Sequence, residues 1–209
     1  MVASFRQQLL QRLQHPLPGL DVQMEMAPPI RGRNPKIPDN VRLSAVLILL
    51  YPHEGTWRIP FMRRSQDGRV HGGQVSFPGG RYEEPDGSYQ QTALREAEEE
   101  LGIDPKTVEL LAPLTEIYIP PSNFMVYPQL AIAQQRPDFR LDPVEVAALI
   151  EVELDELARP EIRGQHQVDV FGGNVITAPG YTVYDQHLIW GGTAMMAAEL
   201  VQLYRELGS

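Results

Sequence analysis

Residues 79–103 constrain this chain more than any other stretch, and they read GGRYEEPDGSYQQTALREAEEELGI. A glycine turn leads into a short acidic loop, after which the pattern predicts a helix over residues 88–101. Asp86 or Ser88 is the expected N-cap of this helix, and Gly102 is its expected stop. An apolar stripe suited to packing on a core runs along one side. It consists of Ala93, Leu94, Ala97 and Leu101.

Another face of this helix is crowded with carboxylates. At roughly 100° per residue, Glu96, Glu99 and Glu100 lie close together around the helix axis. Like charges three or four residues apart oppose a helix by about 0.2–0.5 kcal/mol per pair, so this face needs a compensating charge. A divalent cation, which prefers oxygen ligands, would supply it. A solvated charged face is the usual explanation of an isolated EAEEE string, and we assign Glu98 to such a surface role.

A magnesium-type ion on this face would suit phosphate chemistry. Such ions bind a few carboxylates and substrate phosphates, orient water and neutralise charge on a leaving phosphate. The backbone of Gly79 and Gly80 can turn tightly and approach a phosphate closely. Arg95 is expected to hold a loop carboxylate, Asp86 above all, and so to align the start of the helix. Water attack on a diphosphate bond needs the orientation of water and the charge neutralisation that such an ion supplies.

The composition narrows the class of protein. A hydrophobic content of 43% and a charged content of 22% are ordinary for a soluble globular chain, and 209 residues suffice for one large domain. The absence of cysteine excludes disulfides, zinc–thiolate sites and a thiol nucleophile. A net charge of −9 argues against a nucleic-acid or anionic-membrane surface. The apolar run at residues 43–51 is too short to span a bilayer, and the N-terminus lacks a signal-peptide block, so we expect a cytoplasmic protein.

The remaining pattern predicts a mixed sheet covered by helices on both faces. A helix is expected over residues 4–14. Residues 16–40 follow as an extended arm laid over the domain or as a linker, without helical or strand periodicity. Strands are expected at residues 43–50, 57–62, 74–77, 108–119, 125–133 and 147–153. A hairpin around residues 172–174 is expected within residues 168–184, and a closing helix over residues 189–207.

The segment 95–103, REAEEELGI, resembles the second half of the Nudix box, REUxEExGU, at every specified position. The first half departs from the general pattern, because fourteen residues instead of thirteen separate Gly80 from Arg95. The resemblance covers roughly residue 42 to the C-terminus and implies an α/β/α sandwich with a mixed β-sheet; the N-terminal helix and the proline-rich arm come from the residue pattern and lie outside it. Residues 1–40 would form that helix and extended arm, and residues 41–209 the Nudix hydrolase domain.

A second signature, RSxxxRxxxGxVxFPGG, is similar to that of the coenzyme A pyrophosphatase-like Nudix members. Residues 64–80 meet it at Arg64, Ser65, Arg69, Gly73, Val75, Phe77, Pro78, Gly79 and Gly80. This resemblance implies Mg²⁺- or Mn²⁺-dependent hydrolysis of coenzyme A or an acyl derivative to 3′,5′-ADP and 4′-phosphopantetheine. The substrate would then be a small nucleotide, with no nucleic acid or membrane partner. Other nucleoside diphosphate derivatives (a nucleoside triphosphate, ADP-ribose or a dinucleotide polyphosphate) stay open, as do a non-catalytic nucleotide-sensing module and a homodimer.

The resemblance also implies roles for individual residues. Metal ligands would be Glu96, Glu99 and Glu100, and the catalytic set would comprise Arg95, Glu96, Glu99 and Glu145. The general base could lie on the helix or be Glu145, in the loop before a late strand; an exposed loop acid is an equally good interpretation of Glu145. Substrate phosphates would be bound by Arg64, Arg69, Gly79 and Gly80. For Arg64 and Arg69, pairing with the acidic helix is the alternative.

Overall fold

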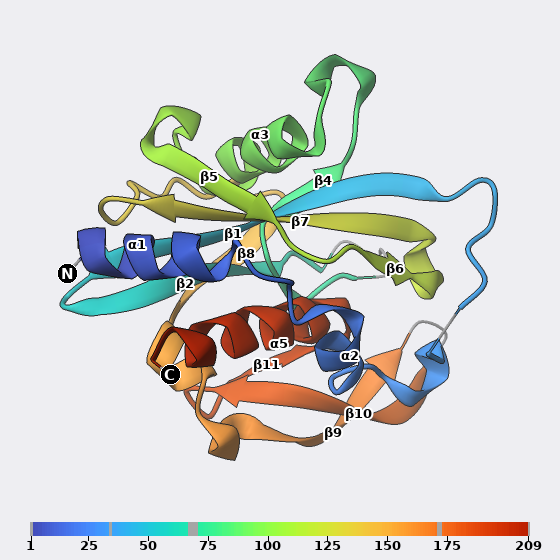
Figure 1. Cartoon of the computed structure of the whole chain (residues 1–209). Coiled ribbons are helices and arrows are strands. Elements are labelled where there is room, and N and C mark those ends of the chain that lie inside the picture. Colours follow the sequence, from blue (N-terminus) through green and yellow to red (C-terminus); the bar gives the residue numbers. More distant parts are fainter. Residues whose placement is uncertain (1, 34, 67–70, 171–172, 209) are drawn as a thin grey trace.

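The computed structural model describes residues 2–33, 35–66, 71–170 and 173–208, and Figure 1 shows their arrangement. Within these residues the main sheet has eight strands in the order β3-β2-β1-β7-β5, with β4 paired to β1, β6 to β7 and β8 to β2. The strands are β1 (Arg42–His53), β2 (Thr56–Arg64), β3 (Val75–Ser76), β4 (Gly79–Arg81), β5 (Val108–Pro113), β6 (Ile117–Ile119), β7 (Phe124–Ala133) and β8 (Val146–Glu153). The pairing of β1 with β7 is parallel and the other pairings are antiparallel, so the sheet is mixed as predicted.

Helices cover both faces of this sheet (Figure 1). They are α1 (Val2–Arg12), α2 (Gly19–Met24), α3 (Tyr89–Leu101), α4 (Leu154–Leu157) and α5 (Gly191–Arg205). Helix α3 lies on one face, and α1 and α5 lie on the other. Beyond α5, a second sheet joins β9 (Arg163–Val170), β10 (Asn174–Val183) and β11 (His187–Trp190) in the order β11-β10-β9. In the described ranges, no helix has both the length and the apolar character needed to cross a membrane.

The buried strand β1 divides the interior into two cores because its side chains point alternately to opposite faces. Ala45, Leu47 and Leu49 pack with the apolar stripe of α3. Ile48 and Leu50 pack on the opposite side with α5. Burying both faces explains why this strand is a nearly continuous apolar run.

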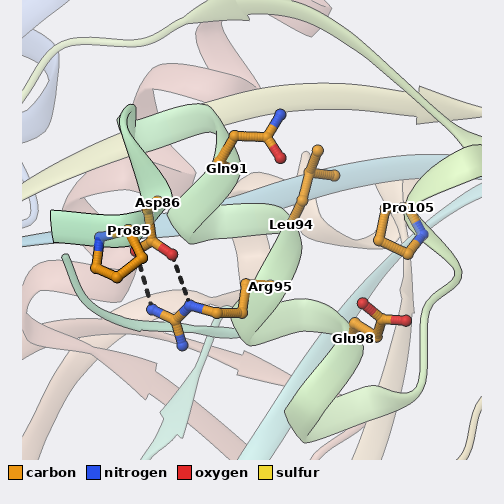
Figure 2. A pocket seen from close by; sticks show the side chains of 7 residues that line it. All are labelled: Pro85, Asp86, Gln91, Leu94, Arg95, Glu98 and Pro105. Carbon is orange, nitrogen blue, oxygen red and sulfur yellow. Dashed lines mark hydrogen bonds and ion pairs between the residues drawn. The ribbon is translucent and has the colours of Figure 1, made fainter. Parts of the chain in front are cut away.

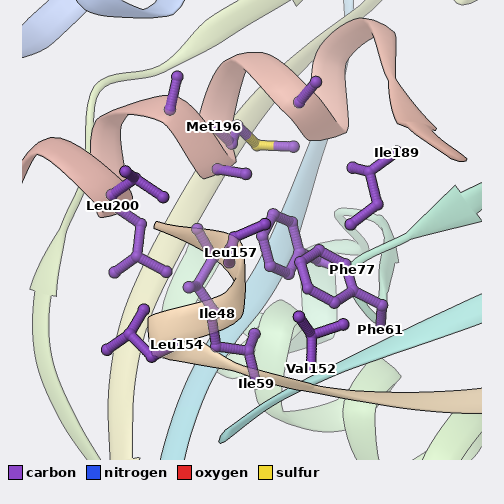
Figure 3. Packing of buried hydrophobic residues seen from close by; sticks show 14 of the residues in the cluster. Ile48, Ile59, Phe61, Phe77, Val152, Leu154, Leu157, Ile189, Met196 and Leu200 are labelled. Atoms are coloured by element: carbon purple, nitrogen blue, oxygen red, sulfur yellow. The ribbon is translucent and has the colours of Figure 1, made fainter. Parts of the chain in front are cut away.

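The core beneath α5 is the larger of the two, and Figure 3 shows part of it. Met196 and Leu200 of α5 meet Ile48 of the sheet there, together with Phe61 and Phe77. The rings of Phe61 and Phe77 lie with their centroids 4.6 Å apart. Phe77 belongs to the glycine-containing signature, so this buried ring anchors the segment that leads to Gly79 and Gly80.

The proline-rich segment lies over the domain, which is one of its two predicted alternatives, but it differs from the prediction in containing the helix α2. Helix α2 packs against α5, and the junction is polar and buried. The carboxylate of Glu199 on α5 accepts hydrogen bonds from the backbone N–H of Gly19 (3.1 Å), from Nε2 of Gln23 (2.9 Å) and from the hydroxyl and N–H of Thr115 (2.6 and 3.2 Å). Periodicity within six residues could not reveal this helix, since these remote partners hold it in place.

Two other predicted elements have different bounds. The predicted strand at residues 108–119 is divided into β5 and β6, because the Thr115 N–H donates to Glu199 instead of to a neighbouring strand. The predicted closing helix begins only at Gly191, since Ile189 pairs with Tyr181 in the small sheet. Of the predicted hairpin turn, Gly172 lies outside the described residues.

Candidate active site

Helix α3 has the predicted bounds and caps. The hydroxyl of Ser88 accepts the N–H of Gln91 at 3.3 Å, which makes Ser88 the N-cap. Gly102 ends the helix in the left-handed conformation, with φ +68°. Asp86 caps differently: its carboxylate accepts the Glu83 N–H at 3.0 Å and closes a capping box in the preceding 3₁₀ turn. The loop that precedes the helix is therefore held by hydrogen bonds of its own.

Arg95 joins this loop to the helix, as predicted. Its Nε lies 2.8 Å from Oδ1 of Asp86 and its Nη2 lies 3.1 Å from Oδ2 (Figure 2). Thr92 also donates its hydroxyl to Asp86 at 2.8 Å. The Arg95 guanidinium holds the pKa of the Asp86 carboxyl well below its usual range. The loop is one residue longer than in the general pattern, and it still places the Asp86 carboxylate against Arg95.

Replacing Asp86 with Ala should destabilise the protein. The change removes the carboxylate that accepts from the Arg95 guanidinium, the Thr92 hydroxyl and the Glu83 N–H, and we expect the free energy of unfolding to fall by about 2–3 kcal/mol near neutral pH. Because folding lowers the pKa of Asp86, this contribution is complete above about pH 4 and is lost as the pH falls further. Urea unfolding at several pH values measures it, with the exposed Glu84→Ala as control. Equal stability of Asp86→Ala and Glu84→Ala would contradict the assignment.

Glu100 is the most deeply buried of the predicted ligands, with a side chain only 1% exposed. Its Oε2 accepts the Gly79 N–H at 2.8 Å, and its Oε1 lies 3.3 Å from Nη1 of Arg64. Burial raises the pKa of Glu100 to about 8, and the charges of Glu96 and Glu145 add to the rise. The pairing of Arg64 with the acidic helix, which the sequence left open, is therefore present.

Glu96 and Glu99 are the more exposed of the predicted ligands on α3. The Glu96 carboxylate occupies the space beside Gly80, where an added Cβ would come within 2.4 Å of Oε2. Burial raises the pKa of Glu96, against the opposing effect of Arg95, whose Nη1 lies 2.8 Å from Oε1. The Glu99 side chain is 58% exposed and lies 3.0 Å from the same Nη1. Because Gly80 has no side chain, there is room beside it for the Glu96 carboxylate.

Glu145 completes the group from a different part of the chain. It lies half-buried just before β8, and its charge contributes to the raised pKa values of both Glu96 and Glu100. Its backbone C=O accepts the N–H of Ser65 at 2.9 Å. The fold therefore brings a loop carboxylate to the carboxylates of α3, beside the end of β2 that carries Arg64. Arg69, the other predicted phosphate ligand, lies outside the described residues.

The donor set suits a divalent ion such as Mg²⁺ or Mn²⁺. Carboxylate oxygens are the ligands such ions prefer, and Mg²⁺ usually takes only one or two of them together with water and phosphate. Among the residues that the structure describes, no three acidic or histidine side chains converge on one point. Arg95 holds Glu96 and Glu99, and Arg64 holds Glu100. The two arginines thus supply the compensating charge in this arrangement.

A mixed sheet between helices, with a carboxylate-bearing helix after a glycine strand, defines a Nudix α/β/α sandwich. The chain belongs to the Nudix family, whose NUDIX domain matches residues 41–169. An uncharacterised Nudix hydrolase NudL of Photorhabdus laumondii is 34% identical over 181 residues, which cover 86% of this chain and 92% of that protein. Nudix hydrolase 22 of Arabidopsis thaliana is 34% identical over 175 residues, covering 81% of this chain and 55% of that one.

Solved structures show the same fold. The NUDIX domain of Shewanella oneidensis NrtR, solved with ADP ribose, has a TM-score of 0.52 and 16% identity, covering 84% of this chain and 94% of that one. The Nudix hydrolase RenU of M. smegmatis has a TM-score of 0.53 and 18% identity, covering 79% and 86%.

Proposed function

We propose that this protein is a divalent-cation-dependent hydrolase of the diphosphate bond in coenzyme A or acyl-coenzyme A, releasing 3′,5′-ADP and 4′-phosphopantetheine or its acyl derivative. Membership of the Nudix family supports the broader class, hydrolysis of a nucleoside diphosphate derivative. The signature at residues 64–80 supports the coenzyme A substrate. The observation that carries the proposal is the buried contact of Glu100 with Arg64 and Gly79, because it joins this signature to the carboxylate helix.

Each group has a proposed role in this reaction. Glu96, Glu99 and Glu100 would hold the ion, which supplies an activated water and charge neutralisation at phosphate when bound. Glu145, whose charge acts on Glu96 and Glu100, would accept a proton from water. Arg95 keeps the helix and its loop aligned.

Arg64 would bind a substrate phosphate. Its guanidinium is about a quarter exposed, at the edge of the carboxylate group. Arginine suits phosphate because its planar donors match the phosphate oxygens. Gly79 and Gly80 stay proposed as substrate-binding backbone, although the Gly79 N–H donates to Glu100 in this structure.

Mass spectrometry of the products tests the function. Purified protein with Mn²⁺ is incubated separately with coenzyme A, dephospho-coenzyme A, ADP-ribose, a nucleoside triphosphate and a dinucleotide polyphosphate. We expect coenzyme A to give the highest kcat/KM and to yield the two named products. Glu99→Gln should lose this activity, and Glu98→Gln, an exposed residue on another face of α3, should keep it.

The other outcomes separate the alternatives. Preferred cleavage of another compound, dependent on Glu99, would keep the Nudix hydrolase and discard the coenzyme A substrate. Binding of these compounds without any turnover would instead support a nucleotide-sensing module, which the intact set of carboxylates disfavours.

A further inference from the structure

The C-terminal end of α3 is capped by the connection between β7 and β8. The last carbonyl groups of a helix have no partner within the helix and need donors from elsewhere. Here the Arg140 N–H donates to the C=O of Leu101 at 2.8 Å, and the Asp142 N–H donates to the C=O of Glu100 at 3.0 Å. This connection is therefore fixed to the turn of helix that carries Glu100.

The close approach requires Gly102. A Cβ at this position would lie 2.7 Å from Cβ of Arg140 and 2.8 Å from its carbonyl oxygen. Gly102 also has a positive φ of +68°, which side chains rarely adopt. Gly102 therefore both ends α3 and leaves room for the β7–β8 connection to pack against it.

Asp142 then shapes the turn that holds Glu145. Its Oδ1 accepts the Val144 N–H at 2.7 Å, and its C=O accepts the Val146 N–H at 2.9 Å. Pro143, which lacks an N–H, occupies the first position of this turn, as proline does at a helix start. Asp142 therefore acts as the cap of one helical turn containing Glu145.

We propose that Asp142 is a positioning residue for Glu145, holding it beside the carboxylates of α3. The inference rests on the proposed function and deepens it. Asp142 fixes Glu145 to the helix on one side, and the Ser65 N–H fixes the Glu145 carbonyl on the other. Without the side-chain cap, the turn loses the bond to Val144 and Glu145 loses its fixed distance from Glu96 and Glu100.

Steady-state kinetics with Mn²⁺ and the best substrate of the wild type test this role. Asp142→Ala should lower kcat by about 10- to 100-fold with little change in KM, because small displacements of a reacting group have effects of that size. Asp142→Asn and Asp142→Ser, which keep an acceptor for the Val144 N–H, should stay within about threefold of wild type. Asp138→Ala is the matched control, since Asp138 lies in the same connection and is 83% exposed.

Hydrogen exchange of the metal-free protein supplies a second readout. The Val144 amide should exchange faster in Asp142→Ala than in wild type, and Asn or Ser should restore its protection. Amides within α3 should keep their protection in every variant, which separates a local change of the turn from unfolding.

Three results would overturn the role of Asp142. They are wild-type kcat in Asp142→Ala, equal losses in the Ala, Asn and Ser variants, and full activity of Glu145→Gln. In each case a wild type that hydrolyses its substrate leaves the proposed function standing. A wild type that hydrolyses none of the panel would refute the function and this role together.

Discussion

Glu100→Gln is expected to reduce hydrolysis at least about 100-fold while leaving the melting temperature unchanged or higher. The amide oxygen can still accept the Gly79 N–H, so the backbone contact survives. Burial opposes the charge of Glu100 and raises its pKa to about 8, so removing the charge relieves an unfavourable interaction. Loss of activity without loss of stability is typical of a group retained for function.

Calorimetry and product assays on the same preparations would measure both quantities. Glu98→Gln is the control, because it changes the same residue type on an exposed position of α3. Near-wild-type turnover by Glu100→Gln would remove Glu100 from the active site. A melting temperature several degrees lower, with proportionate loss of activity, would make it a structural residue.

Glu199→Ala should have the largest effect on stability, about 3–5 kcal/mol. Four donors from α2 and the turn between β5 and β6 lose their acceptor, in a place where Glu199 and Gln23 are both fully buried. Donors in partly or fully buried places pay a desolvation cost when their acceptor is removed, although Nε2 of Gln23 keeps the Thr115 C=O as a second acceptor. Chemical denaturation of wild type and variant measures the difference.

Glu199→Ala should loosen the protein mainly in the proline-rich segment. Limited proteolysis should cut Glu199→Ala within residues 16–40 sooner than wild type, because α2 loses its contacts with the domain. Glu98→Ala, exposed on α3, should behave as wild type in both measurements. Unchanged stability of Glu199→Ala would show that the apolar contacts of the arm suffice to hold it.

Local patterns allowed much of the site to be predicted. The bounds of α3, its caps and the contact of Arg95 with Asp86 are confirmed, because each depends on residues within a few turns of one another. The sandwich is confirmed as well, since alternating burial along β1 requires cover on both faces. The metal ligands and the base stay predictions.

Other features depend on residues far apart in the chain. Helix α2 is held by Glu199 and Thr115, which no local period connects to it. Sequence analysis also missed Asp142. The Asp142-Pro143 pair, an N-cap residue followed by a proline, was the available signal for a turn. Its docking on α3 could not be foreseen, because it depends on the space left by Gly102.

The parallel pairing of β1 with β7 has a consequence for synthesis of the chain. It places Arg42 beside Phe124, so β1 must wait for the whole intervening segment before it gains this partner. Until then one edge of this long, apolar strand has no partner on the growing chain, and exposed strand edges of this kind associate with one another. The nearer partners β2 and β4 pair with the other edge of β1, so the edge that β7 takes stays open until residues 124–133 have been made.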